Sequence, residues 1–285
     1  MRAVKPSHIF IIGLLISAFT LSIRFFAHQK VVASISDSRL VEVSGIDESY
    51  TNPGYFWTHN DSDSDPIIYL IDKEGNIHME VTLEGIENRD WEEIVTVNNG
   101  EQSFIYVAET GDNRAVHESV SLIQLEEPIF NSATSNVPRE KLKIMQFKYA
   151  EGARDAEAVL YDYQKQEFVL VTKREKHAMV YSFPFEINPT PMVIKAKGTI
   201  PSRNFTAADM NEKGELLLKH YDSIFYWGQS SKPAVDRILD WNPRTIDYTP
   251  EPQGEAICWH NGSFYTISEK NIGKPQEMLY FQRLR

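Results

Sequence analysis

A composite unit of two short strands recurs five times along the chain and restricts the folds open to it. In each copy a polar-then-apolar strand leads through a turn to an aromatic or aliphatic strand and then to a charged cluster. The anchor positions of the five copies, residues 44, 92, 157, 208 and 255, lie 48, 65, 51 and 47 residues apart. Periods of this length are typical of propeller blades with four strands.

The strands of this unit are predicted from short alternating runs rich in Val, Ile, Tyr, Phe and Thr, whereas helical periodicity is hard to find after residue 30. Four copies carry a glycine in the turn between their first two strands, as tight hairpins require: Gly54, Gly100, Gly214 and Gly262. Each unit then continues with further strands. We therefore predict an all-β protein, a β-propeller of about five four-stranded blades, with a sixth, degenerate blade as the alternative.

The last copy of the unit has one strand too few. A single further strand, Met278 to Leu284, follows its first two. The segment Val31 to Ile35 precedes the first copy and is available as the missing outer strand. Such a strand would close the ring and remove exposed sheet edges, so we predict one propeller domain over residues 31–285.

The N-terminal segment has the pattern of an export signal. Arg2 and Lys5 precede an apolar run from Ile9 to Ile23, which matches a charged n-region followed by an h-region. The run has 15 residues, short against the roughly 20 that a membrane-spanning helix needs. Residues 1–30 are therefore predicted to contain an apolar helix that is either a cleaved signal peptide or a membrane anchor. We expect an exported protein, periplasmic or secreted, or held at the inner membrane by this segment alone.

Composition excludes several classes of function. The formal net charge of −11 and a pI near 5.3 make the chain repel nucleic acid. Cys258 is the only cysteine, so neither an intrachain disulfide nor a thiolate metal cluster can form. The sequence contains no Gly-Xaa-Ser-Xaa-Gly elbow and no Walker-type loop, so serine-hydrolase and nucleotide-binding functions lack support.

The charged residues of the repeat are expected to meet at one mouth of the central channel. The innermost strand of a blade starts at the face where the second strand ends, because the two form a hairpin whose turn lies on the opposite face. The predicted metal ligands, near the starts of the innermost strands, are Glu92, Glu157, Asp209 and Glu255. The predicted ligand-binding residues, at the ends of the second strands, are Asn60, Asp61, Asp112, Asn113, Lys173, Lys219, Tyr221 and Glu269.

Carboxylates gathered in this way must be neutralised. Two of them about 4 Å apart repel by about 4 kcal/mol at an effective dielectric constant near 20. A bound cation, the nearby lysines or protonation of one carboxyl would offset that repulsion. Oxygen donors without thiolates or paired histidines favour Ca²⁺. The alternative interpretation is structural: Glu92, Glu157 and Glu255 bridge neighbouring blades through backbone N–H groups and salt bridges.

The segments that open three inner strands resemble those of a known group of proteins. They read Asp90-Trp91-Glu92-Glu93-Ile94, Asp155-Ala156-Glu157-Ala158-Val159 and Gln253-Gly254-Glu255-Ala256-Ile257. They are similar to the Asp-Xaa-Glu-Gly-Ile strands of exported bacterial propellers of the phytase-like and SdiA-regulated type, and the likeness covers residues 40–284. The resemblance implies a propeller fold, an extracytoplasmic location and Ca²⁺ at the channel mouth. Lys173, Arg174 and Lys219 depart from the dense acidic site of true phytases, so phytase activity does not carry over.

Two functions follow from these expectations. The first is a non-catalytic binding or scaffolding propeller of the cell envelope, which recognises a small anionic or sugar-like ligand or an envelope protein at the charged mouth. The second is a calcium-assisted phosphoesterase or related hydrolase, in which the metal polarises the substrate and Glu157 activates water. The residues leave the choice between binding and catalysis open.

Overall fold

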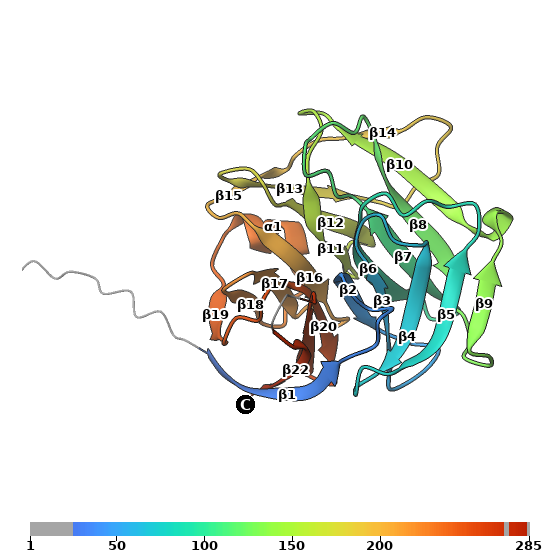
Figure 1. Cartoon of the computed structure of the whole chain (residues 1–285). Coiled ribbons are helices and arrows are strands. Elements are labelled where there is room, and N and C mark those ends of the chain that lie inside the picture. The colour runs from blue at the N-terminus through green and yellow to red at the C-terminus, as the bar shows by residue number, and fades with distance from the viewer. Residues whose placement is uncertain (1–24, 271–273, 284–285) are drawn as a thin grey trace, which may run out of the picture.

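The computed structural model describes residues 25–270 and 274–283, which are built almost entirely of β-strands (Figure 1). The helical segments within these ranges are the short α1 (Ala234–Leu239) and one 3-10 turn (Arg139–Lys141). None of these described helices has the length and apolar character needed to cross a membrane. The apolar run of residues 9–23, predicted to be helical, lies outside the described residues. Residues 25–30, which the sequence grouped with that run, begin strand β1 instead.

The strands form blades in which chain order runs outward from the channel. Blade 1 consists of β2 (Val43–Glu48), β3 (Tyr55–Asn60), β4 (Ile67–Asp72) and β5 (Ile77–Leu83). Blade 2 consists of β6 (Trp91–Asn98), β7 (Ser103–Glu109), β8 (Val120–Glu126) and β10 (Lys143–Tyr149). Blade 3 consists of β11 (Ala156–Asp162), β12 (Glu167–Thr172), β13 (Ala178–Phe183) and β15 (Gly198–Ile200).

The last two blades share one continuous sheet. Blade 4 consists of β16 (Phe205–Met210), β17 (Leu216–His220), β18 (Ile224–Trp227) and β19 (Arg244–Asp247). Blade 5 consists of β20 (Gly254–His260), β21 (Ser263–Ser268), β22 (Gln276–Arg283) and β1 (Phe25–Ile35). Short parallel strands cover two outer edges, β9 (Thr134–Val137) beside β5 and β14 (Met192–Ile194) beside β10. Covered edges leave fewer unpaired backbone groups for association with another chain.

The ring is closed by the strand that the sequence predicted for this purpose. β1 runs antiparallel to β22, with Val31 opposite Leu279 and Ile35 opposite Gln276. The start of β1 also pairs in parallel with β19, which joins blades 4 and 5. The innermost strands contact one another in the order β2, β6, β11, β16, β20 and back to β2 (Figure 1). The protein is therefore a five-bladed β-propeller, and the alternative of a sixth blade is wrong.

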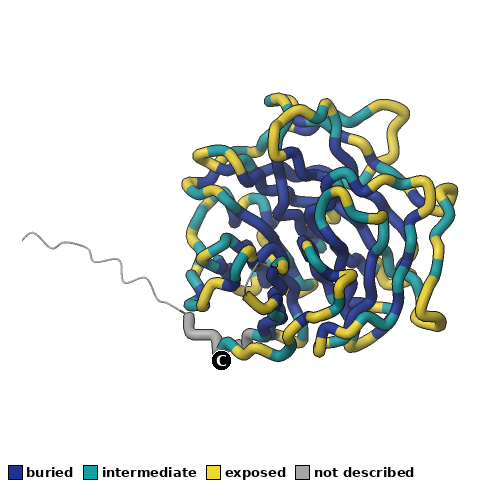
Figure 2. The backbone as a smooth tube through the Cα atoms, in the orientation of Figure 1, coloured by how far each residue is buried: buried dark blue, intermediate teal, exposed yellow. Residues whose placement is uncertain are grey.

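The cores lie between neighbouring blades, where the apolar faces of adjacent sheets meet. Trp57 of blade 1 and Trp91 of blade 2 are both fully buried in one such layer. Figure 2 shows the result: buried residues in the inner strands and exposed residues in the peripheral loops. Since apolar burial supplies most of the favourable free energy of folding, these layers hold the blades in fixed relative positions.

Every innermost strand has a β-bulge at its second residue. The register shifts fall between Val43 and Gly45, Trp91 and Glu93, Ala156 and Ala158, Phe205 and Ala207, and Gly254 and Ala256. The extra residues are thus Ser44, Glu92, Glu157, Thr206 and Glu255. The blade 4 anchor therefore lies at residue 206, and its predicted place at residue 208 is wrong by two positions.

A glutamate crosses the channel just beyond the bulges. The Glu93 carboxylate of blade 2 accepts a hydrogen bond of 3.3 Å from the backbone N–H of Ala208 in blade 4, and these blades are not neighbours. Glu93 is 1% exposed. The equivalent positions in the other blades are occupied by Gly45, Ala158, Ala207 and Ala256, which leave room for one long side chain. Glu93 therefore fills the channel between its two mouths.

Candidate functional site

Carboxylates converge where the innermost strands begin, as the repeat predicted. Asp61, Asp90 and Glu92 each offer an oxygen within 4.8 Å of the others, and Glu92, Asp155 and Glu157 form a second group with the same property. Glu92 belongs to both groups. We call these five residues together with Glu255 the acidic mouth.

The bulges explain why the glutamates of the acidic mouth point inward together. A bulge places an extra residue on one strand and redirects its side chain. Glu92, Glu157 and Glu255 occupy this position in three blades and are only 2%, 3% and 4% exposed. Their near-complete burial makes their charges expensive to leave unneutralised.

In the other two blades the bulge residue carries a hydroxyl group and bridges to the next blade. The Ser44 hydroxyl lies 3.0 Å from the Glu92 carbonyl oxygen and 3.2 Å from the Glu92 carboxylate. The Thr206 hydroxyl donates to the carbonyl of Gly254 at 3.0 Å. In these two blades, Ser44 and Thr206 therefore form the bridges between neighbouring blades that the structural interpretation assigned to the glutamates.

Gly111 makes room for two of the acids. A Cβ atom at this position would lie well inside van der Waals contact with Glu92 Oε1 and Asp90 Cγ, so any side chain would collide with both. Asp90 is 7% exposed, and its Oδ1 atom is buried without a hydrogen-bond partner among the described groups. Buried carboxylate oxygens are ordinarily paired, and an unpaired one is available to a ligand.

Burial and mutual repulsion raise the pKa values in this part of the mouth. The pKa of Asp61 is raised to about 8, by burial and by the charges of Asp90 and Glu269. The pKa of Glu92 is raised well above its usual range, by burial and then by Glu157 and Asp61. Burial and the charge of Glu255 raise the pKa of Glu269 to about 7. Without a cation, protons must offset part of the repulsion.

A lysine neutralises the other side of the acidic mouth. Lys173 forms an ion pair with Glu157, and its Nζ atom lies 3.8 Å from Glu255. Tyr221 donates a hydrogen bond of 2.7 Å to Glu255 from its hydroxyl group, and its ring centroid lies 5.1 Å from Lys173 Nζ. Burial lowers the pKa of Lys173, but the two carboxylates outweigh burial and raise it, so this side chain stays charged.

Of the predicted ligand-binding residues, Asp61, Lys173, Tyr221 and Glu269 contact or face the acidic mouth. Three others form hydrogen bonds that hold nearby loops. Asn60 bonds to the backbone of residues 39, 41 and 42, and Asp112 accepts from the amides of residues 116 and 117. The Asn113 side chain accepts from Arg174. Lys219 is fully buried behind the mouth, where it donates to the Gly254 carbonyl at 2.5 Å. Burial lowers its pKa.

The structure separates Asp209 from the other three predicted metal ligands. Asp209 lies three residues beyond the blade 4 bulge, near the far end of β16, where its carboxylate accepts a hydrogen bond of 2.6 Å from the backbone N–H of Trp259. The alignment of the repeats took Ala208 or Asp209 as the acidic anchor of this blade, whereas the bulge residue is Thr206. Placing Asp209 in the acidic mouth was therefore a register error.

Sequence reasoning did not assign a role to Asp90, Asp155 or Gly111. The first two stand two residues before Glu92 and Glu157, so an Asp-Xaa-Glu pattern shared by two blades was the available signal. Gly111 follows β7 in a stretch without a distinctive motif. Its closeness to Glu92 depends on the packing of a loop, which the local sequence does not encode.

Comparisons with known proteins give no family for this chain. No protein-family model matches the sequence, and a search of curated proteins finds no match. Among solved structures, a luciferin-regenerating enzyme is similar with a TM-score of 0.47 and 9% identity, over 90% of this chain and 96% of that one. A chain of a nidogen/laminin complex has a TM-score of 0.45 and 7% identity, over 83% and 79% of the two chains.

A third similar structure is a putative oxidoreductase (glucose dehydrogenase) from Thermus thermophilus. Its TM-score is 0.45 and its identity 7%, over 90% of this chain and 99% of that one. Similarities at this level do not transfer activity, because one fold carries many functions. We draw no function from these three proteins.

Proposed function

We propose that this protein is an exported propeller that binds Ca²⁺ at the acidic mouth and uses the bound ion to hold a small anionic ligand, without turnover. The observation that carries the proposal is the unequal neutralisation of the mouth. Lys173 pairs with Glu157 and lies near Glu255, whereas Asp61, Asp90 and Glu92 gather with a buried, unpartnered oxygen. A divalent cation would replace the protons that otherwise offset this charge.

The chemistry of the donors favours Ca²⁺ over other metals. All candidate ligands of the two groups are carboxylates, and Ca²⁺ takes six to eight oxygen ligands in flexible geometry. Three or four protein carboxylates would leave positions for water or for an anion on the solvent side. Phosphate, carboxylate or sulfate groups suit such positions, and a sugar-like ligand bearing one of them is included in the proposal. An envelope protein that presents an acidic side chain would use the same chemistry.

A binding role is favoured over hydrolysis by the surroundings of Glu157. A general base needs a free lone pair within reach of the water that it activates. The Glu157 carboxylate is instead held in an ion pair with Lys173. The second candidate, a calcium-assisted phosphoesterase, is favoured by one observation: Glu92 belongs to both acidic groups, and a shared carboxylate suits two neighbouring metal ions.

Calorimetry with Ca²⁺ after treatment with EDTA tests the cation site. We expect binding to the wild type and a loss of affinity of about 100-fold or more in Asp90→Asn and Glu92→Gln, since each removes a charged oxygen ligand. Glu186→Gln is the control, because Glu186 is exposed on the loop after β13 and the change removes the same formal charge. Equal affinity in all four proteins, or no binding to the wild type, would reduce the acidic mouth to a structural role.

A phosphoesterase screen separates the two candidates. With Ca²⁺ present, p-nitrophenyl phosphate and phosphodiester substrates should not be turned over by the wild type. Turnover that disappears in Glu157→Gln would establish the hydrolase instead. Binding of inorganic phosphate or of a simple sugar phosphate only in the presence of Ca²⁺ would support the anion-binding role.

Export is tested separately, because the cation site does not depend on it. A fusion of residues 1–30 to a reporter that is active only after translocation should be active. Recovery of the reporter free in the periplasm would identify a cleaved signal, and recovery in the membrane fraction would identify an anchor.

A further inference from the structure

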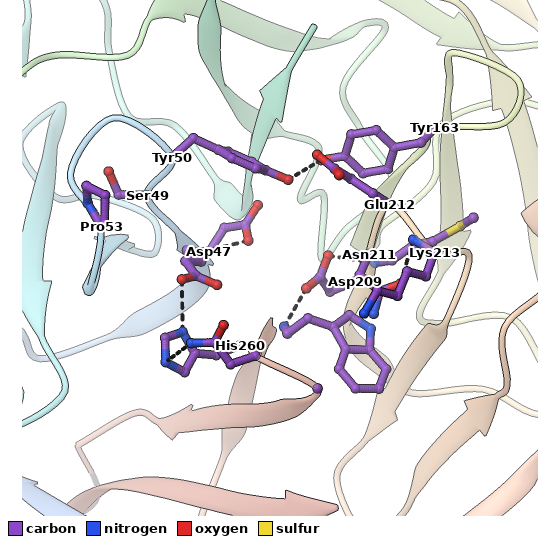
Figure 3. Close-up of a pocket in the computed structure, with 15 residues that line it drawn as sticks. Asp47, Ser49, Tyr50, Pro53, Tyr163, Asp209, Asn211, Glu212, Lys213 and His260 are labelled. Carbon is purple, nitrogen blue, oxygen red and sulfur yellow. Dashed lines mark hydrogen bonds and ion pairs between the residues drawn. The ribbon is translucent and has the colours of Figure 1, made fainter. Parts of the chain in front are cut away.

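A second concave site lies at the mouth opposite the acidic mouth. It is a cavity of about 380 Å³ between the turns that follow the innermost strands of blades 1, 3, 4 and 5 (Figure 3). The residues important for its chemistry are Asp47, Tyr50, Tyr163, Asp209, Trp259 and His260. Glu93 fills the channel between the two mouths, so this opposite pocket is a separate compartment.

Two aspartates of the opposite pocket are fixed by equivalent contacts. Asp47 and Asp209 each stand three residues beyond a bulge. Asp47 accepts a hydrogen bond of 2.6 Å from the backbone N–H of Thr96 in the next blade, and Asp209 accepts one of 2.6 Å from Trp259 in the same way. Among the described residues, the Oδ1 atom of each carboxylate accepts from the amide of the following residue alone. The two groups are therefore held in place while retaining capacity to accept further hydrogen bonds.

The opposite pocket carries an excess of negative charge. Glu48 and Glu212 also line it, and the basic side chains that line it are Lys213 and His260. His260 lies 3.0 Å from Glu48, which engages one of these basic groups. Burial raises the pKa of Asp209 to about 6. Burial and the charge of Asp209 raise the pKa of Asp47 well above its usual range. A cation in the cavity would relieve this repulsion.

Aromatic side chains supply the remaining walls. The hydroxyl groups of Tyr50 and Tyr163 are 2.9 Å apart, and Figure 3 shows this pair extending across one side of the pocket. Tyr50 is 37% exposed, so its ring is accessible. Trp259 is 6% exposed, and its indole N–H has no hydrogen-bond partner among the described groups. Aromatic faces attract cations that have shed water, and they favour large, weakly hydrated ones.

We propose that the opposite pocket binds an organic ammonium ion of about the size of choline or butylammonium. Asp47 and Asp209 supply the negative charge, and Tyr50, Tyr163 and Trp259 supply the apolar and π surface. The volume of about 380 Å³ falls within the range of small-molecule sites. No three metal-ligating side chains converge here among residues 25–270 and 274–283, so a broad organic cation fits better than a compact metal ion.

Calorimetry with choline and its neutral isostere 3,3-dimethyl-1-butanol tests the proposal. Every titration contains a saturating concentration of Ca²⁺. Any acidic site that accepts an inorganic cation can then already hold one before choline is added. We expect choline to bind and the neutral isostere to bind about tenfold more weakly or worse, because only choline carries the charge. Equal binding of the two, a loss of choline affinity when Ca²⁺ is raised about tenfold above the saturating level, or no choline binding at roughly 10 mM would each overturn the proposal.

Variants of residues that line the opposite pocket test whether choline binds there. Asp209→Asn keeps a side-chain oxygen that can accept from the Trp259 amide but removes the charge, and it should weaken choline binding about tenfold. Tyr50→Ala removes an exposed aromatic wall without touching an innermost strand, and it should weaken binding about fivefold. Glu186→Gln should leave the affinity unchanged.

Circular dichroism and thermal unfolding check that each variant folds. If Asp209→Asn does not fold, Tyr50→Ala decides, because Tyr50 is at the surface. Unchanged affinity in a folded Tyr50→Ala protein, or equal weakening in Glu186→Gln, contradicts a site in the opposite pocket.

Discussion

Replacing Lys173 with methionine tests whether the protein carries its own cation at the acidic mouth. Lys173 is 5% exposed, pairs with Glu157 and lies 3.8 Å from Glu255. Methionine preserves most of the length and apolar volume of the side chain but removes the ammonium group. The two glutamates would then remain buried, with the Tyr221 hydroxyl as a neutral partner of Glu255.

The expected loss follows from the burial of this ion pair. Removing one partner of a buried pair costs about 3–5 kcal/mol, because the other charge is left without compensation. Proton uptake limits the loss: burial raises the pKa of Glu157 well above its usual range even though Lys173 opposes that rise. Without Lys173 the carboxyl would take up a proton more readily. We therefore expect a loss of about 3 kcal/mol at pH 8 and a smaller loss at pH 5.

Urea unfolding followed by tryptophan fluorescence, in EDTA and in Ca²⁺, measures the effect. Ca²⁺ should recover part of the stability of Lys173→Met, because a second cation can occupy the position of the ammonium group. Lys219→Met is the matched control: Lys219 is also buried and lies 3.7 Å from a carboxylate, but that carboxylate is Glu251, which is not part of the acidic mouth. Its loss of stability should not be recovered by Ca²⁺. Wild-type stability of Lys173→Met at pH 8 in EDTA, or a larger loss at pH 5, would refute this reasoning.

Three further predictions concern the site and the ring. Gly111→Ala should weaken Ca²⁺ binding measured by calorimetry by about tenfold or more, because its Cβ would collide with the Glu92 carboxylate; unchanged affinity would contradict the close packing. Asp61, with a pKa of about 8 when folded and near 4 when unfolded, keeps a proton that the unfolded chain releases; thermal unfolding in EDTA should therefore show stability falling from pH 5 to pH 8, and a rise would oppose the assignment. Glu127→Ala should cost about 3 kcal/mol in urea unfolding, since buried Glu127 accepts from the Trp57 indole and from three other donors; a cost under about 1 kcal/mol would argue against that network.

The repeat predicted most of the fold because propeller blades are local units. Each blade consists of hairpins between strands that follow one another in sequence, so alternation, turn glycines and a period near 50 residues were enough to predict five blades. The closing strand was predicted for the same reason: a unit lacking one strand requires a partner, and Val31 to Ile35 had strand character. The parallel strands β9 and β14 were not predicted, because each adds to the edge of a blade built from another part of the chain.

The amino-acid sequence by itself determined the five blades, the closing strand and the gathering of Glu92, Glu157 and Glu255 at one mouth. Only the tertiary structure decided which other residues join them. A bulge shifts the register by one residue and reverses the direction of every side chain beyond it, so the place of Asp209 could not be read from spacing alone. Burial and neighbouring charge, which set the protonation of Asp61 and the role of Lys173, depend on blades far apart in the chain.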